Sequence, residues 1–236
     1  IAGVSGYSGM DTARLVAAHP AFALAAAVSD TWAGSADGAH LTVADPATAV
    51  RVVKQADAGG SFAGLELVFL CTPAEVSIAL AAEALRAGAR VVDLSGAFRL
   101  APELYPRWYG FEHPRPDLLA SAVYSMPEAG ASGSVRGAHL VSNPGCYATA
   151  STLGALALLR GGVVEPQGLV IDAKSGTTGA GKKASEDFSF SEVDGDFRAY
   201  RVLKHQHTPE IERALSLSGH DAGRVTFTPH LLPTRR

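Results

Sequence analysis

The stretch IAGVSGYSGMD, residues 1–11, decides the fold of this 236-residue chain. Ile1 and Ala2 look like the last step of a buried strand, and residues 3–9 space three glycines as GxxGxxG before a helical pattern over residues 11–18. Glycines at a strand-to-helix turn let the backbone N–H groups approach a pyrophosphate. The spacing differs from the commoner GxGxxG, so a plain tight turn stays an alternative to dinucleotide binding.

Outward from this turn, apolar runs of strand length alternate with helical segments. Strand-length runs cover residues 23–28, 67–71, 90–93 and 139–142, and helical patterns cover 73–87 and 146–159. Such alternation is typical of a doubly wound parallel sheet, so we predict an α/β fold. Residues 102–127 lose this periodicity and indicate a long irregular excursion. Later strands are predicted at residues 169–174 and 225–228.

Composition narrows the function classes. The chain is 47% hydrophobic and 18% charged, with a formal net charge of -3, and its basic residues are scattered. We therefore expect a folded protein that does not bind nucleic acid. No apolar run approaches the length of a membrane span and no leader pattern opens the chain, so we predict a soluble, cytoplasmic protein. The chain starts before a first strand could be completed and stops after a strand-like run without a closing helix, so we expect a fragment of a longer protein.

The end of the second predicted strand bears on cofactor choice. Asp30 lies near the distance from the glycine turn at which a ribose is contacted, and there it would favour NAD. Its neighbours Ser29 and Thr31 would instead suit a 2'-phosphate. The residues themselves leave NAD and NADP open.

Cys146 is the candidate nucleophile. It follows the chain-reversing Asn143-Pro144-Gly145 and begins a predicted helix, where the dipole stabilises a thiolate. The alternative is a buried structural thiol. Cys71 ends a predicted core strand and is interpreted as structural. Two cysteines are too few for a disulfide framework or a metal cluster.

Two histidines and a carboxylate form the second candidate cluster. His205 and His207 precede a helix predicted to start at Thr208-Pro209-Glu210, with the Thr208 hydroxyl as its cap. Imidazoles suit proton transfer near neutral pH. An exposed loop is the competing interpretation, and we predict no metal because a third ligand of fitting spacing is missing.

Two further segments suit anions. Residues 175–183 form a hydroxyl-rich and glycine-rich loop that ends in two lysines, which is typical of an anion cradle but equally of a solvated loop. Arg99 follows a predicted strand, and its planar guanidinium suits a bidentate phosphate contact.

Taken together, six motifs resemble the N-acetyl-gamma-glutamyl-phosphate reductases, and the resemblance runs along essentially the whole chain. The motifs are GVSGYSG (3–9), DLSGAFRL (93–100), SNPGCY (142–147), SGTTGAG (175–181), HQHTPEI (205–211) and FTPHLLP (227–233). The cysteine motif also suits aspartate-semialdehyde dehydrogenase, whereas HQHTPEI is more specific to the arginine-pathway enzyme.

The resemblance implies a Rossmann-type NADP-binding domain, placed at residues 1–145, followed by an α+β catalytic and dimerisation domain at 146–236, incomplete at its C-terminus. It also implies reduction of N-acetyl-glutamyl phosphate through a Cys146 thioester, with phosphate release, in a homo-oligomer, either a dimer or a tetramer. The implied catalytic residues are Cys146, His205, His207 and Glu210. The implied cofactor contacts are Gly3, Ser5, Gly6, Tyr7, Ser8, Gly9, Ser29, Ser175 and Gly176. The implied substrate and phosphate contacts are Arg99, Asn143 and Thr177. His205 is slightly preferred over His207 as the acid.

One residue departs from the family pattern and leaves alternative functions open. Ala97 stands where many members carry aspartate, and it matches the aspartate-semialdehyde branch instead. The alternatives are therefore aspartate-semialdehyde dehydrogenase, a reductase of carrier-linked aminoadipyl phosphate, and a non-catalytic NADP-binding module.

Overall fold

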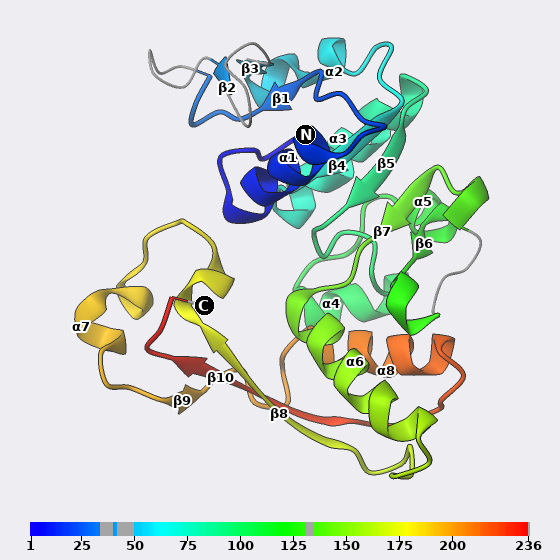
Figure 1. Cartoon of the computed structure of the whole chain (residues 1–236), viewed down its shortest axis with the longest axis vertical. Helices are drawn as coiled ribbons and strands as arrows, with labels where there is room; N and C mark the ends of the chain where they lie inside the picture. Colours follow the sequence, from blue (N-terminus) through cyan, green and yellow to red (C-terminus); the bar gives the residue numbers. More distant parts are fainter. Residues whose placement is uncertain (34–39, 42–49, 131–134, 236) are drawn as a thin grey trace. The chain divides into compact units, whose positions relative to one another are not determined.

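A computed structural model describes residues 1–33, 40–41, 50–130 and 135–235 (Figure 1). By its internal contacts the chain divides into two compact units. The first unit contains Ile1–Phe98, Ala120–Val123 and Ser134–Asn143, and the second contains Arg99–Leu119, Tyr124–Gly133 and Pro144–Arg236. The predicted domain boundary between residues 145 and 146 stays a prediction.

The first unit is built on a parallel sheet. Its strands are β1 (Ala27–Val28), β2 (His40–Leu41), β3 (Val50–Val53), β4 (Leu67–Leu70), β5 (Arg90–Asp93) and β7 (Leu140–Ser142). Ala2 forms parallel bridges to both Val28 and Leu70, and so joins the β1–β3 pair to the β4–β5–β7 set. Strand β2 pairs antiparallel with β3. The strand order reverses at Ala2, which is the arrangement of a doubly wound fold, and the predicted fold class is confirmed.

Helices α1 (Tyr7–Ala18), α2 (Ala58–Ser61) and α3 (Ala74–Arg86) belong to the same unit. The prediction placed the first helix at residue 11, but α1 begins four residues earlier with Gly6 as its N-cap. The last three residues of the glycine motif are therefore helical. Ile1, Val4, Ala13 and Val52 are among the buried side chains that pack beneath this turn.

The predicted irregular region contains short elements rather than none. They are the 3-10 helices Pro102–Leu104 and Pro127–Ala129, α4 (Tyr105–Trp108), α5 (Pro116–Ser121) and β6 (Val123–Tyr124). Prolines begin three of these turns, because a residue without an N–H is tolerated in the first turn of a helix.

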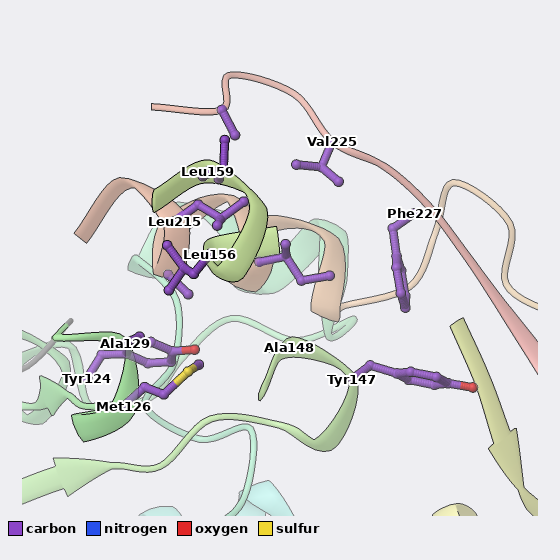
Figure 2. Packing of buried hydrophobic residues seen from close by; sticks show 13 residues of the cluster. Tyr124, Met126, Ala129, Tyr147, Ala148, Leu156, Leu159, Leu215, Val225 and Phe227 are labelled. Carbon is purple, nitrogen blue, oxygen red and sulfur yellow. The ribbon is translucent and has the colours of Figure 1, made fainter. Parts of the chain in front are cut away.

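The second unit packs two helices and a small sheet. Its later elements are α6 (Cys146–Arg160), β8 (Val170–Gly176), α7 (Phe190–Val193), β9 (Arg198–Ala199), α8 (His207–Leu217) and β10 (Thr226–Leu232). Strand β10 lies between β8, to which it is parallel, and β9, to which it is antiparallel. Figure 2 shows the core in which Leu156 and Leu159 of α6 meet Leu215 of α8, with Phe227 of β10 beside Tyr147.

Three local predictions in this unit are corrected. Helix α8 begins at His207 with Gln206 as its N-cap, and the Thr208 hydroxyl makes no hydrogen bond, so Thr208 is not the cap. Strand β8 extends to Gly176, into the predicted glycine loop. Strand β10 was predicted over residues 225–228, but it runs from Thr226 through Pro229 to Leu232. The Pro229 carbonyl still accepts a hydrogen bond from the Tyr200 N–H at 3.0 Å.

Within the described residues, no helix combines the length and hydropathy that crossing a membrane requires. The same residues contain no group of three histidine, cysteine, aspartate or glutamate side chains placed to hold a metal ion.

Candidate functional site

The glycine turn of the first unit leaves no room for side chains at two positions. Gly3 has φ +80°, and a Cβ there would lie 2.4 Å from the carbonyl oxygen of Cys71. A Cβ on Gly9 would lie 2.2 Å from the carbonyl oxygen of Gly3. Only glycine fits at either position, so the chain folds tightly onto the strand end and the start of α1. This is the cradle that a pyrophosphate requires.

Hydroxyl groups line the neighbouring strand end. The Ser29 hydroxyl donates to the Ser5 hydroxyl at 2.9 Å, so these two predicted cofactor contacts lie together. The Asp30 carboxylate accepts a hydrogen bond from the Gln55 N–H at 2.7 Å and is exposed. The Asp30 carboxylate therefore already has a hydrogen-bond partner within the protein, whereas Ser5 and Ser29 lie together at the turn. Tyr7 and Ser8, also predicted contacts, lie in the first turn of α1.

Cys146 is the first residue of α6 and is exposed, as the sequence predicts for a nucleophile at a helix start. Gly145 before it is the N-cap, with an extended backbone. Asn143, a predicted phosphate contact, is exposed at the end of β7 in the first unit, where its N–H donates to the Asp93 carbonyl at 2.8 Å.

The backbone of Gly145 is enclosed by an imidazole and a guanidinium. A Cβ on this glycine would lie 2.2 Å from Nε2 of His207 and 2.7 Å from Nη1 of Arg99. Both side chains are buried, with exposed fractions of 7% and 6%. The second unit thus places His207 and Arg99 against the residue that precedes the candidate nucleophile.

Glu210 is the centre of this cluster and is fully buried. Its Oε1 accepts hydrogen bonds from the Gly145 N–H at 2.7 Å and from the Tyr124 hydroxyl at 3.1 Å. Its Oε2 lies 3.6 Å from Nη1 of Arg99 and 3.7 Å from Nε2 of His207. Burial raises the pKa of Glu210, and the Arg99 charge opposes that rise.

Arg213 lies on α8, the same helix as Glu210, and contacts the cluster. Its guanidinium donates to the Arg99 carbonyl oxygen and lies over the Tyr124 ring, 5.1 Å from the centroid. Arg213 therefore contacts two of the residues that surround the Glu210 carboxylate. No sequence pattern identifies Tyr124 or Arg213, because both act through contacts between distant segments.

His207 is neutral at ordinary pH. Burial, followed by the Arg99 charge, lowers the pKa of His207 to about 3. A bound anion at Arg99 would offset the second cause and make the imidazole more basic. The pKa of His207 should therefore rise when an anion binds to Arg99.

His205 is also neutral, and its tautomer is fixed. Burial, followed by electrostatic interactions with His207 and Arg201, lowers the pKa of His205 to about 3. Its Nδ1 accepts a hydrogen bond from the His207 N–H at 3.1 Å, so the ring proton is on Nε2. His205 therefore offers one hydrogen-bond donor, at Nε2.

Aromatic rings enclose His205. The ring centroids of Tyr147, Tyr200 and Phe227 lie 5.5, 5.7 and 5.4 Å from that of the imidazole. The Tyr200 hydroxyl lies 3.3 Å from that of Tyr147, which donates to the His230 carbonyl at 3.0 Å. Burial is the main cause of the raised pKa of both tyrosines, and the electrostatic interaction with Cys146 adds to the rise. The two hydroxyls thus lie near the thiol, although sequence analysis assigned neither a role.

The predicted anion loop forms hydrogen bonds with backbone carbonyl groups of the protein itself. The Thr177 N–H and hydroxyl both donate to the Thr234 carbonyl, at 2.9 and 3.1 Å. Ser175 donates to the Gly176 carbonyl at 3.0 Å, and a Cβ on Gly179 would lie 2.7 Å from its hydroxyl. The roles predicted for Ser175, Gly176 and Thr177 stay predictions.

Cys71 differs from Cys146. It is half-buried at the end of β4, and its Sγ lies 3.7 Å from the Thr12 hydroxyl. Burial raises the pKa of the Cys71 thiol, and the Thr12 bond opposes that rise. These surroundings keep the thiol protonated and agree with a structural role.

Family models match both parts of the chain. The NAD binding domain of semialdehyde dehydrogenase matches residues 1–133, and the semialdehyde dehydrogenase dimerisation domain matches residues 146–236.

Curated relatives agree with these models. An N-acetyl-gamma-glutamyl-phosphate reductase of Symbiobacterium thermophilum is 43% identical over 241 residues, covering 100% of this chain and 68% of the relative. The protein of that name from Magnetococcus marinus is 38% identical over 237 residues, covering 100% of this chain and 67% of the relative.

Solved structures share the fold. Aspartate semialdehyde dehydrogenase II of Vibrio cholerae has a TM-score of 0.73 at 14% identity, covering 99% of this chain and 70% of the other. Aspartate semialdehyde dehydrogenase of Candida albicans, solved with NADP, has a TM-score of 0.63 at 14% identity, covering 99% and 67%.

Proposed function

Because the chain belongs to the N-acetyl-gamma-glutamyl-phosphate reductases of the semialdehyde dehydrogenase family, we propose that it reduces N-acetyl-L-glutamyl 5-phosphate to the 5-semialdehyde, with release of phosphate, in arginine biosynthesis. The observation that carries the proposal is the cluster around Gly145, in which Arg99, His207 and Glu210 meet directly before Cys146. A thiol at a helix start, an arginine and two imidazoles are the groups that acyl transfer from a phosphate to sulfur requires.

The first step is acyl transfer to Cys146. Its thiolate attacks the acyl carbon, the bond from that carbon to the phosphate oxygen breaks, and a thioester forms. Arg99 neutralises the departing phosphate, with Asn143 and Thr177 as further proposed contacts. Glu210 keeps Arg99 in place and holds the Gly145 N–H, which fixes the start of α6. Its raised pKa reflects burial, and the surrounding donors still favour the carboxylate.

The second step is reduction of the thioester. When bound, NADPH supplies the hydride for this carbon. The residues that would hold it are those of the glycine turn and strand end, and the absence of side-chain room at Gly3 and Gly9 suits a dinucleotide. His205 donates a hydrogen bond from Nε2 to the thioester oxygen as negative charge develops there, and the carbonyl then re-forms as the carbon–sulfur bond breaks, giving the aldehyde and the Cys146 thiolate.

The division of labour between the histidines stays a prediction. His205, the preferred acid, has its Nδ1 occupied by the His207 N–H, which suits donation from Nε2. His207 lies against Gly145 and next to Arg99, which suits a role in the phosphate-release step. If His205→Ala kept near-native turnover while His207→Ala lost it, the roles would be exchanged.

The dimerisation-domain match supports assembly of the family through this part of the chain. The protein is proposed to act as a homo-oligomer, a dimer or a tetramer, and light scattering on the intact protein measures which.

The reaction is tested in the oxidative direction. The assay follows phosphate-dependent formation of NADPH from N-acetyl-glutamate semialdehyde, with aspartate semialdehyde as the competing substrate. Turnover of the acetylated aldehyde and little of the other is expected. Preference for aspartate semialdehyde, or NADP binding without turnover of either, would overturn the proposal.

A further inference from the structure

A cavity of about 380 Å³ in the second unit has no role in the chemistry described above. It is lined by Arg107 and Trp108 of α4 and by Leu203 and Lys204 of the turn before α8. The Arg107 guanidinium lies over the Trp108 indole, 5.0 Å from the ring centroid. The lining thus combines two cations with an aromatic and an aliphatic surface.

Both walls of the cavity are tied to the site. Lys204 directly precedes His205 in the chain, so this wall ends at an imidazole of the cluster. The other wall belongs to α4, whose Tyr105 hydroxyl accepts a hydrogen bond from the Arg99 N–H at 3.1 Å. Each wall of the cavity is thus one peptide bond or one hydrogen bond from a residue of the cluster.

The turn that forms the second wall is strained. Arg201 and Leu203 have φ of 44° and 59°, and they are the non-glycine residues with positive φ among those described. Such backbone conformations are unfavourable for residues that carry a side chain, and they concentrate at ligand-binding segments. The strained backbone presents Leu203, an apolar side chain that is 68% exposed, to the cavity.

The charges of the lining select for an anion. Within the described part of the chain, neither Arg107 nor Lys204 forms an ion pair with a carboxylate. The cations are thus available to a ligand, and the indole and leucine surfaces suit a small neutral acyl group beside the anion.

We propose that this cavity binds the amino-acid end of the substrate, with Arg107 and Lys204 on its α-carboxylate and Trp108 and Leu203 against its N-acyl group. This inference rests on the proposed function and names the residues that determine its specificity. An unacylated substrate would carry an ammonium group into the same two cations, and repulsion would disfavour it. The N-acetyl amide is neutral and avoids that penalty.

The test compares N-acetyl-glutamate semialdehyde as the free acid with its neutral α-methyl ester, in the phosphate-dependent assay. The variants are Arg107→Met and Lys204→Met, which keep the aliphatic stem and remove the charge. Arg224→Met is the matched control, because Arg224 is exposed and lies outside the cavity lining.

In the unmodified protein, kcat/KM should be about tenfold or more lower for the ester than for the acid, since a hydrogen bond between charged groups is lost. In each variant, kcat/KM for the free acid should fall by a similar factor, and kcat/KM for the ester should not change. The KM values for phosphate and NADP should also stay unchanged. The control should discriminate as the unmodified protein does.

The outcomes separate the two proposals. Equal losses on acid and ester in the variants, or no discrimination by the unmodified protein, would overturn the cavity assignment while leaving the reaction intact. Absence of turnover of the free acid by the unmodified protein would overturn the proposed function itself.

Discussion

The backbone N–H of Gly145 donates a hydrogen bond to Oε1 of Glu210 at 2.7 Å, across 65 positions of sequence. Gly145 is the N-cap of α6 and Glu210 lies in the first turn of α8, so one buried carboxylate lies near the positive ends of two helix dipoles. This arrangement stabilises the carboxylate against the desolvation that raises its pKa. It also makes the start of the cysteine helix depend on α8.

Removing Glu210 should destabilise the protein strongly. Glu210→Ala leaves the Gly145 N–H, the Tyr124 hydroxyl and the Arg99 charge without their buried partner, and the expected loss in the free energy of unfolding is about 3–5 kcal/mol. Glu212→Ala is the control on the same helix, because it loses a single hydrogen bond from the Val225 N–H, worth about 1 kcal/mol. Urea unfolding measures both. Similar losses for the two variants would show that the cluster does not stabilise the fold.

A methyl group at Gly145 should abolish turnover at a smaller structural cost. The Cβ of Gly145→Ala would displace the ends of His207 and Arg99, which are flexible side chains, so we expect a loss of more than about a hundredfold in kcat/KM for a loss of about 1–3 kcal/mol in stability.

Gly154→Ala is the matched control for this change. Gly154 lies within α6 with open space around its Cβ position, so alanine should stabilise the protein by about 0.5–1 kcal/mol and leave kcat/KM unchanged. Near-native turnover of Gly145→Ala would refute the placement of the site.

Stability should fall in mild acid because of the two histidines. The pKa of His207 is about 3 in the folded protein against roughly 6.5 in the unfolded chain, so between these values the unfolded state binds more protons. The stabilising contribution is complete above pH 6.5 and decreases as the pH falls toward 3. His205 has the same sign.

The measurement is the free energy of unfolding against pH for the unmodified protein and for His207→Gln. Below pH 6, the free energy of unfolding of the variant should fall by about 1.4 kcal/mol less per pH unit than that of the unmodified protein. Above pH 7.5 the two slopes should coincide. Parallel curves throughout the acid range would mean that His207 is accessible to protons in the folded state.

The two cysteines should differ in reactivity. Cys146 is exposed at a helix start, whereas Cys71 is half-buried with a raised pKa, so iodoacetamide should label Cys146 first and abolish turnover. Cys146→Ser should lose several orders of magnitude in kcat and keep NADP binding, and Cys71→Ser should change little. Peptide mapping by mass spectrometry identifies the labelled thiol. Turnover without Cys146 would exclude the thioester route.

Local sequence patterns predicted the parts of the fold that local physics determines. The doubly wound sheet, strand β5 at residues 90–93 and Cys146 at the start of α6 were predicted from apolar runs and chain breakers. Tertiary contacts decided the rest. Thr208 resembles a cap, yet α8 starts one residue earlier, where the His207 N–H bonds to the His205 ring.

Only part of the candidate site could be predicted, because tertiary contacts between distant segments complete it. Cys146, His205 and Glu210 belong to motifs, whereas Tyr124 and Arg213 become visible only when β6 and α8 meet. A tyrosine in a two-residue strand has no pattern that would identify it as a partner of a buried carboxylate.

The division of the chain by contacts has a practical meaning for protein engineering. Arg99 and Tyr124, which precede Cys146, belong to the same compact unit as Cys146. A chimera joined between residues 145 and 146 would therefore combine the nucleophile and histidines of one parent with the arginine and tyrosine of the other. Modular exchange in this family should instead move those two earlier segments together with the later half, so that the buried carboxylate keeps the partners with which it evolved.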